Sequence, residues 1–195
     1  MTNLHDDEPE GATPLTPEER EGLIPAHVTL RRELNELEQQ NILEASLWVI
    51  RRSRDPVSEP FARNLHKRMF SQVWRWAGDN RASNKNIGCD WWEIDLQLQG
   101  VFDDTKTCIE FSSYPADEIA VRFHHRLVAI HPFANGNGRW SRLMGDTLAR
   151  RLGQSAFSWG NSSLLDDDAT RRAYIDALRA ADRHDIGPLL AFSRS

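Results

Sequence analysis

Hydrophobic side chains recur along this chain at intervals of three and four residues, with charged and polar side chains between them. That spacing places the apolar positions on one face of an α-helix. No segment shows a strong strand pattern. We therefore predict an all-α protein of six to eight helices, which the spacing places at about 29–52, 58–73, 92–111, 115–130, 137–152, 166–181 and 186–192.

Two segments interrupt the helical pattern. Residues 1–25 hold four prolines, many acids and few apolar side chains, which is typical of an extended arm. Within the arm, Thr16 followed by Pro17 and Glu19 predicts a short helix that starts with a capping box. Residues 82–93 are rich in Asn, Gly and Ser, which favours a loop or a small β-hairpin.

Composition narrows the class of protein. Hydrophobic residues make up 39% of the chain and charged residues 27%, an ordinary globular balance. The net charge of −5 argues against direct nucleic-acid binding, and two cysteines without repeated Cys/His spacing argue against a structural zinc site. The acidic N-terminus does not resemble a secretory signal, and no apolar run is long enough to span a membrane. We expect a soluble, cytoplasmic protein that consists of the arm and a single domain over 26–195.

The densest chemistry lies in residues 131–142, with the sequence HPFANGNGRWSR. His131 can exchange a proton near neutral pH. Gly136 and Gly138 permit a sharp turn, and a helix that begins near Asn137 would offer free backbone N–H groups to an anion. Arg139 and Arg142 would share one face of that helix, where guanidinium groups suit phosphate oxygens. This combination predicts chemistry on a polyphosphate.

The same stretch resembles the motif HPFx(D/E)GNGRxxR of the Fic (Fido) family and departs from it at Asn135. Residues 76–81, with the sequence WAGDNR, are similar to the WAGxxR stretch of that family. The similarity runs over about 58–178, which would be the core of the Fic domain. The segment from Thr13 to Asn35 further resembles the subgroup called mobile mystery protein B.

The resemblance implies a Fic-type helical domain with a small β-hairpin flap. It also implies a protein adenylyltransferase, which transfers AMP from ATP to a Ser, Thr or Tyr hydroxyl of a target protein. In such an enzyme His131 would be the general base. The groups that would bind the nucleotide phosphates and the adenine are then Gly136, Asn137, Gly138, Arg139, Arg142 and Tyr174.

Asn135 leaves the activity open. The family's acidic residue at this position binds Mg²⁺, and an Asn oxygen is a permissible but uncharged ligand for Mg²⁺ or Mn²⁺. One alternative is therefore a nucleotide-binding regulatory protein with little or no turnover. A second alternative is a protein phosphotransferase like the family's Doc members, which carry Lys where this chain has Gly138.

Resemblance also implies a flap that binds an extended segment of the target. The candidate residues are Ser83, Asn84, Lys85, Asn86 and Ile87, with Lys85 and Ile87 reaching toward the target. The partner would be a target protein with an exposed hydroxyl.

Control of the activity has two open explanations. Many family members carry an inhibitory (S/T)xxxE(G/N) helix, and this chain holds only partial matches, at Glu33 and at Glu21. The alternative is a separate small antitoxin protein, since the family includes toxin–antitoxin pairs.

Overall fold

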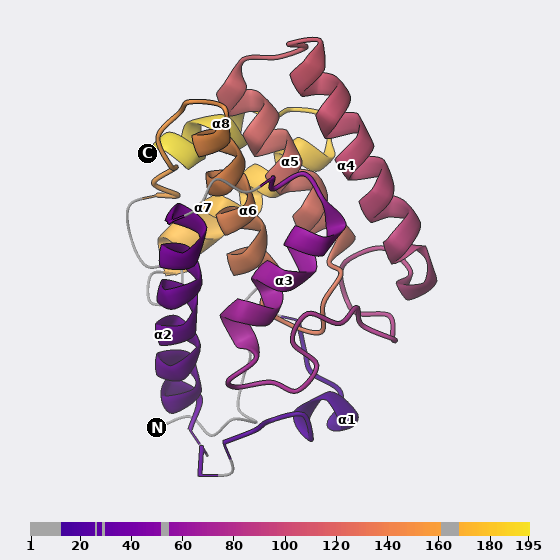
Figure 1. Cartoon of the computed structure of the whole chain (residues 1–195), viewed down its shortest axis with the longest axis vertical. Coiled ribbons are helices and arrows are strands. Elements are labelled where there is room, and N and C mark those ends of the chain that lie inside the picture. The colour runs from indigo at the N-terminus through magenta and orange to yellow at the C-terminus, as the bar shows by residue number, and fades with distance from the viewer. Residues whose placement is uncertain (1–12, 26, 29, 52–54, 161–167) are drawn as a thin grey trace.

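The computed structural model describes residues 13–25, 27–28, 30–51, 55–160 and 168–195, without the side chains of residues 31 and 168. Within these residues the protein is helical, and Figure 1 shows the helices packed as a bundle. The predicted all-α class is confirmed. The elements in chain order are α1 (Pro17–Arg20), α2 (Arg31–Ile50), α3 (Glu59–Phe70), the short 3₁₀ helix η1 (Trp91–Glu93), α4 (Ile94–Glu110), α5 (Ala116–Ile130), α6 (Asn137–Arg151), α7 (Asp168–Asp182) and α8 (Gly187–Arg194).

Local signals explain several helix ends. The capping box of α1 is confirmed, because Thr16 Oγ1 accepts the Glu19 N–H at 3.3 Å and the Glu19 carboxylate accepts the Thr16 N–H at 2.8 Å. Helix α3 begins after Ser58, as predicted, with a proline in its first turn. The predicted cap of α7 involves residues 166 and 167, which lie outside the described residues.

Residues 82–93 do not form the small hairpin that we predicted. In the described parts of the chain, β pairing is limited to isolated contacts, such as the bridge between Leu23 and Trp74. Side-chain hydrogen bonds replace a strand ladder in this loop. The Asn84 amide donates to Asp90 at 2.7 Å and accepts the Trp91 N–H at 2.9 Å, which closes the loop without pairing its two arms.

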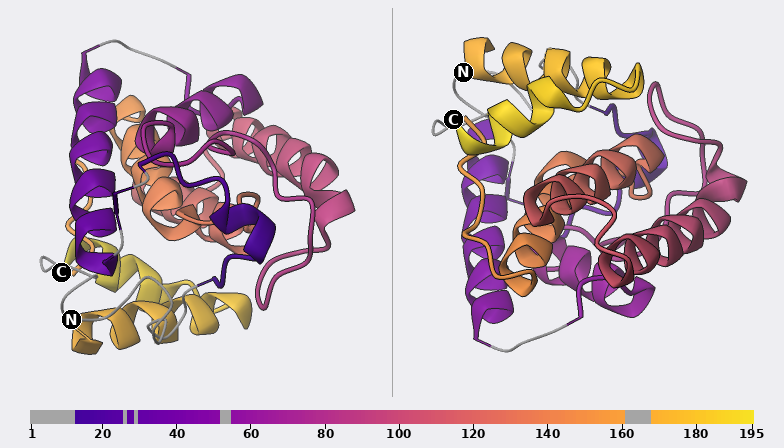
Figure 2. Two further views of the ribbon diagram at one scale, coloured as in Figure 1. Left: turned by 90° about the horizontal axis from the view of Figure 1, so that it is seen from below. Right: turned by 90° about the horizontal axis from the view of Figure 1, so that it is seen from above.

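Helices α5 and α6 form the centre of the bundle, with the other helices around them (Figure 2). They pack closely because α6 carries Gly145, where a Cβ atom would lie 3.1 Å from the His124 Cβ of α5. Trp140 of α6 is fully buried, and its indole N–H donates to the Ala62 carbonyl of α3 at 3.0 Å. This central pair fixes the connection between α5 and α6, which contains the 131–136 segment.

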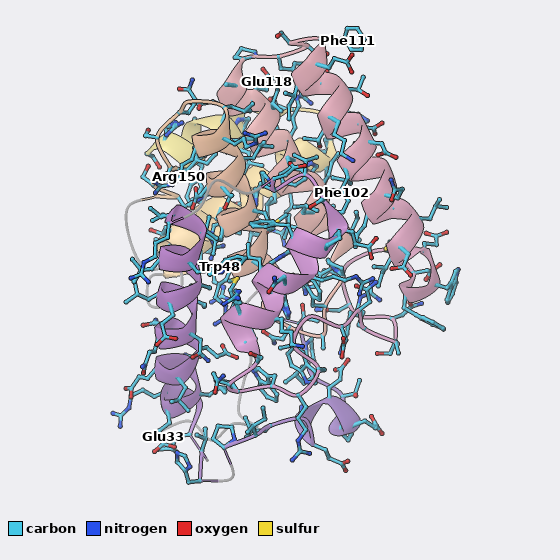
Figure 3. All side chains as sticks on the ribbon, in the orientation of Figure 1. Glu33, Trp48, Phe102, Phe111, Glu118 and Arg150 are labelled. Atoms are coloured by element: carbon cyan, nitrogen blue, oxygen red, sulfur yellow. The ribbon has the colours of Figure 1, made fainter. Side chains whose placement is uncertain are left out.

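Helix α2 lies along one side of the bundle (Figure 1). Its Trp48 side chain stacks on Phe61 of α3 with ring centroids 5.9 Å apart, and Figure 3 labels Trp48 on the inner side of α2. Leu43 and Leu47 on the same helix are exposed. None of the described helices is long and apolar enough to cross a membrane.

The buried histidines make a prediction about stability. Burial lowers the pKa of His66 and of His124 to about 3 and that of His131 to about 4, from an ordinary value of 6.5. Below pH 6.5 the unfolded chain therefore binds protons that the folded chain does not, and the free energy of unfolding should fall by up to about 1.4 kcal/mol per pH unit for each histidine. Urea unfolding between about pH 7.5 and about pH 5 measures this slope.

Asp146 acts in the opposite direction. Burial raises the pKa of its carboxyl to about 6, so the folded chain takes up a proton there first and offsets part of the loss below pH 6. His125→Asn is the control variant. Its free energy of unfolding should fall with pH as that of the unchanged chain does, because His125 lies on a partly exposed edge against Asp182. A free energy of unfolding that stays constant or rises as the pH falls through this window would contradict the prediction.

Candidate active site

His131 is the residue at which α5 ends. Its backbone is in the left-handed region, with φ 55° and ψ 59°, and Pro132 follows. The ring Nδ1 lies 3.2 Å from the Val128 carbonyl, so Nδ1 carries the proton and Nε2 is the free acceptor. Burial lowers the pKa of the ring to about 4. At neutral pH, His131 is therefore an unprotonated base whose Nε2 faces away from α5.

Arg81 holds this end of α5 in place. Its side chain is buried, with Nε donating to the His131 carbonyl at 2.7 Å and Nη1 donating to the Ser83 carbonyl at 2.7 Å. Nη2 donates to the Cys89 carbonyl and, at 3.4 Å, to the Ile130 carbonyl. One guanidinium group thus joins the base to both ends of the 83–89 loop.

The loop between α5 and α6 is braced from inside. The Asn137 side-chain amide makes two hydrogen bonds with the backbone of Phe133. Its oxygen accepts the Phe133 N–H at 2.9 Å, and its nitrogen donates to the Phe133 carbonyl at 2.8 Å. We predicted that this side chain would contact a phosphate; the structure uses it to shape the loop. His66 braces the other side, because its ring stacks on Phe133 at 3.7 Å and its Nε2 bonds the Asn135 carbonyl at 3.0 Å. Its Nδ1 accepts the Gly78 N–H at 3.0 Å.

The braced loop leaves backbone N–H groups at the start of α6. The first intrahelical bond runs from the Trp140 N–H to the Gly136 carbonyl at 2.9 Å, so the three preceding N–H groups have no intrahelical acceptor. Gly136 itself has φ 79°, and a Cβ atom there would lie 2.5 Å from the Phe70 ring. The turn therefore needs glycine at this position, and it leaves a helix N-terminus of the kind that suits an anion.

Arg139 is already paired in this structure. Its Nη1 lies 2.6 Å from the carboxylate of Glu38 on α2, and its guanidinium also lies over the Phe70 ring. Glu38 is buried and accepts a second bond, from the Trp74 indole N–H at 2.7 Å. A phosphate group that binds Arg139 must therefore compete with a carboxylate of the same chain.

Arg142 lies one turn further along α6. Its guanidinium is 5.2 Å from the centre of the Tyr174 ring of α7, and the Tyr174 hydroxyl bonds His124 Nε2 at 3.2 Å. Tyr174 is buried, and the Arg142 guanidinium packs against the face of its ring. The structure brings Tyr174 to the site through that contact.

Asn135 does not offer a magnesium site. Its side-chain oxygen accepts the Gly136 N–H at 2.6 Å and faces the Arg139 guanidinium at 3.5 Å, which are two donors rather than a cation-binding environment. The described residues contain no cluster of three or more His, Cys, Asp or Glu that could hold a metal. The donor set around Asn135 therefore does not fit the predicted Mg²⁺ or Mn²⁺.

The 83–87 loop contacts the N-terminal arm. Lys85 Nζ donates to the Pro14 carbonyl at 3.0 Å and forms an ion pair with Glu19, while Ile87 is exposed. Figure 2 shows the arm and α1 crossing one end of the α5–α6 pair beside this loop. The arm reaches the base itself, because Thr13 Oγ1 lies 2.7 Å from His131 Nε2.

Sequence reasoning named some of these residues without their roles and missed others. Arg81 belongs to the WAGxxR stretch, but its clamp was not predicted. His66 and Glu38 gave no signal, because each acts on a residue far away in the chain. The acids that we named as inhibitory candidates have other contacts: Glu33 caps the first turn of α2, at the lower end of that helix in Figure 3, and Glu21 is exposed after α1. The carboxylate that pairs with Arg139 is Glu38.

Comparison with known proteins agrees with this geometry. Residues 56–149, which include Arg81 and the whole of the 131–142 segment, match the model of the Fic/DOC family. Residues 56–149 therefore form a Fic/DOC domain. The elements of this Fic/DOC domain are α3 to α6 and the loops between them.

Curated relatives of the Fic/DOC domain include the "Protein adenylyltransferase Fic" of Aedes aegypti, which is 38% identical over 73 residues. This match covers 37% of the chain and 13% of the relative, so the chain corresponds to a small part of that protein. The subgroup of the family is not distinguished by these matches.

Solved structures share the fold. The N-terminal Fic domain of a VirB-translocated Bep effector protein from Bartonella quintana, with bound ADP, has a TM-score of 0.68 at 15% identity and covers 86% of each chain. The BepC protein of Bartonella tribocorum, with bound AMPPNP, has a TM-score of 0.68 at 15% identity over 91% of this chain and 96% of that one.

The Arg81 clamp predicts a large effect of a charge-conserving change. Arg81→Lys keeps the charge but cannot donate to carbonyls in three directions, so buried acceptors lose their partners. We expect the free energy of unfolding to fall by at least about 2 kcal/mol in urea titrations. The matched control is Arg63→Lys, since Arg63 pairs with Glu59 and Asp95 at the surface, where we expect a loss below about 1 kcal/mol. If both variants lost the same free energy of unfolding, the hydrogen bonds of Arg81 would contribute no more to stability than the surface ion pairs of Arg63.

Proposed function

We propose that this protein is an adenylyltransferase that transfers AMP from ATP to a Ser, Thr or Tyr hydroxyl of a target protein. The observation that carries the proposal is the environment of His131 Nε2. This nitrogen is unprotonated, buried and 2.7 Å from a hydroxyl oxygen, beside a helix N-terminus suited to phosphate. A base, a hydroxyl and an anion site are the groups that transfer of a phosphoryl-linked group to an alcohol requires.

In the proposed reaction, the hydroxyl oxygen attacks the α-phosphorus of ATP and gives its proton to His131 Nε2. A bond forms between this oxygen and the α-phosphorus, and the bond from the α-phosphorus to the bridging oxygen of the β-phosphate breaks. Pyrophosphate leaves. The N–H groups at the start of α6 would stabilise the negative charge on the α-phosphate.

The two arginines would bind the leaving phosphates. Arg142 is held by Tyr174, so its guanidinium is positioned before the nucleotide arrives. Arg139 would exchange the Glu38 carboxylate for a phosphate. Tyr174 then acts through Arg142 as a positioning residue. ATP-dependent transfer is also supported by the ADP and AMPPNP bound in the structures of two proteins of the same fold.

The partners would be a protein with an exposed hydroxyl and, because the family includes toxin–antitoxin pairs, a small antitoxin protein. In that setting the chain would be the toxin of a pair. The 83–87 loop would then bind the target, with Lys85 donating to a backbone carbonyl as it does to Pro14.

Labelled ATP tests the reaction. With ATP labelled at the α-phosphate, we expect label on proteins of a cell lysate, and with ATP labelled at the γ-phosphate we expect none. His131→Ala should lower the rate about 10²–10⁴-fold because the base is lost. His125→Ala is the matched control, since His125 is on α5 but bonds Asp182 away from the site. Label from the γ-phosphate alone would show phosphotransfer, and bound ATP without any label would show a nucleotide-binding protein without turnover.

The Glu38–Arg139 pair predicts a gain in nucleotide binding. Glu38→Gln keeps an oxygen for the Trp74 indole but removes the negative charge that competes with phosphate. We expect ATP to bind about tenfold more tightly in calorimetric titrations, which corresponds to about 1.4 kcal/mol. Glu36→Gln is the control, because Glu36 is exposed beside Arg32 on the same helix. Unchanged or weaker binding in Glu38→Gln would show that Glu38 does not compete with the nucleotide.

A further inference from the structure

The arm places a hydroxyl of the chain itself on the base. Thr13 is buried, with only 5% of its surface exposed, and its Oγ1 lies 2.7 Å from His131 Nε2. Because Nδ1 donates to Val128, the hydrogen of this bond comes from the threonine. The Thr13 carbonyl also bonds the Asn135 amide at 3.4 Å. Thr13 therefore occupies the position from which an acceptor hydroxyl would give up its proton.

The residues after Thr13 are held by the loop that we assign to target binding. Lys85 donates to the Pro14 carbonyl and pairs with Glu19, and its ammonium group is almost fully buried between them. The capping box fixes Glu19 relative to Thr16, and the Trp76 indole N–H donates to the Glu19 carbonyl at 2.9 Å. The arm is thus bound like an extended substrate, with a backbone carbonyl on Lys85 and a hydroxyl on the base.

A second anchor fixes the register of the arm. The Ile24 N–H donates to the Val73 carbonyl at 2.8 Å, and the Arg75 N–H donates to the Gly22 carbonyl at 2.9 Å. This antiparallel contact ties the end of the arm to the segment after α3. The arm is therefore held on Lys85 near its start and on the segment after α3 at its end. In this register Thr13, and not Thr16, contacts His131.

We propose that Thr13 is an acceptor of the AMP group within its own chain. This inference rests on the proposed AMP transfer. The Thr13 Oγ1–hydrogen bond breaks as the proton passes to His131 Nε2, a bond forms between Oγ1 and the α-phosphorus of ATP, and pyrophosphate leaves. The product is a threonine–AMP phosphodiester on the arm.

The side chain of residue 13 favours a role as acceptor of the AMP group over a role in which the arm only covers His131. A segment that only covers the base needs no hydroxyl, and an apolar side chain would fill the same space. Thr13 instead donates to the one free nitrogen of His131. Because acceptor and base belong to one folded chain, the acceptor is present at a high effective concentration. Until the arm moves, the same contact keeps an outside hydroxyl from His131.

The purified full-length chain and ATP labelled at the α-phosphate test the proposal. We expect one label per chain, which peptide mass spectrometry places on Thr13. Thr13→Val keeps the shape of the side chain without its hydroxyl and should abolish this label, whereas Thr13→Ser should retain it. Labelling of lysate proteins, measured in the same samples, reports separately whether the protein transfers AMP at all.

Dilution distinguishes transfer within a chain from transfer between chains. The rate constant for labelling Thr13 should not change over about a hundredfold dilution, because the step is intramolecular. A His131→Ala chain offers Thr13 without a base. Mixed with the unchanged chain, which labels itself, and separated from it by a size tag, the His131→Ala chain should remain unlabelled.

Each contrary result has a definite meaning. Label on another residue, or label that persists in Thr13→Val, overturns the assignment to Thr13. Labelled lysate proteins together with an unlabelled Thr13 overturn it as well and leave a blocking arm, while the proposed function stands. A rate proportional to concentration overturns transfer within the chain. Absence of label from both the chain and the lysate, with ATP bound, overturns the proposed function and this inference together.

Discussion

The structure of the site depends on the hydrogen bonds of Arg81 with the end of α5. A non-glycine residue with the left-handed backbone of His131 is disfavoured by about 1–3 kcal/mol and persists only where its surroundings hold it. The buried guanidinium provides that hold, since it binds the His131 and Ile130 carbonyls at once. The same group binds the Ser83 and Cys89 carbonyls, so the base and the 83–89 loop share one support. A change at Arg81 therefore acts on both.

The turn into α6 follows the same design, in which side chains hydrogen-bond the loop and the N–H groups at the start of the helix have no acceptor within it. Asn137 and His66 bond the loop from inside, and Gly136 makes the turn into α6. Donors fixed in this way need no rearrangement when charge develops on a phosphate. Two side chains of the site are bound by other groups of the same chain. Glu38 pairs with Arg139, and the Thr13 hydroxyl bonds His131. His131 and Arg139 therefore already have partners within the chain.

Local sequence accounted for most of the helices and for the centre of the site. Helix α5 ends before Pro132 and α6 starts at Asn137, as the apolar spacing and the glycines predicted, because these signals act within one or two turns. The capping box at Thr16 was likewise predictable from four neighbouring residues. For residues 82–93 local sequence left a loop and a hairpin open, and the structure has the loop, in which the Trp91 N–H bonds the Asn84 side chain instead of a backbone carbonyl.

By itself, the sequence determined the helical class, the place of His131 at the end of a helix and the turn that presents backbone N–H groups, because each depends on residues close together in the chain. Only the tertiary structure decided what those groups contact. Glu38 and Arg139 are 101 residues apart, and Thr13 and His131 are 118 residues apart. No local pattern encodes such pairs, because packing of whole helices and of the arm brings them together. The partners of the base and of the first arginine, and with them the state of the site, therefore follow from the fold.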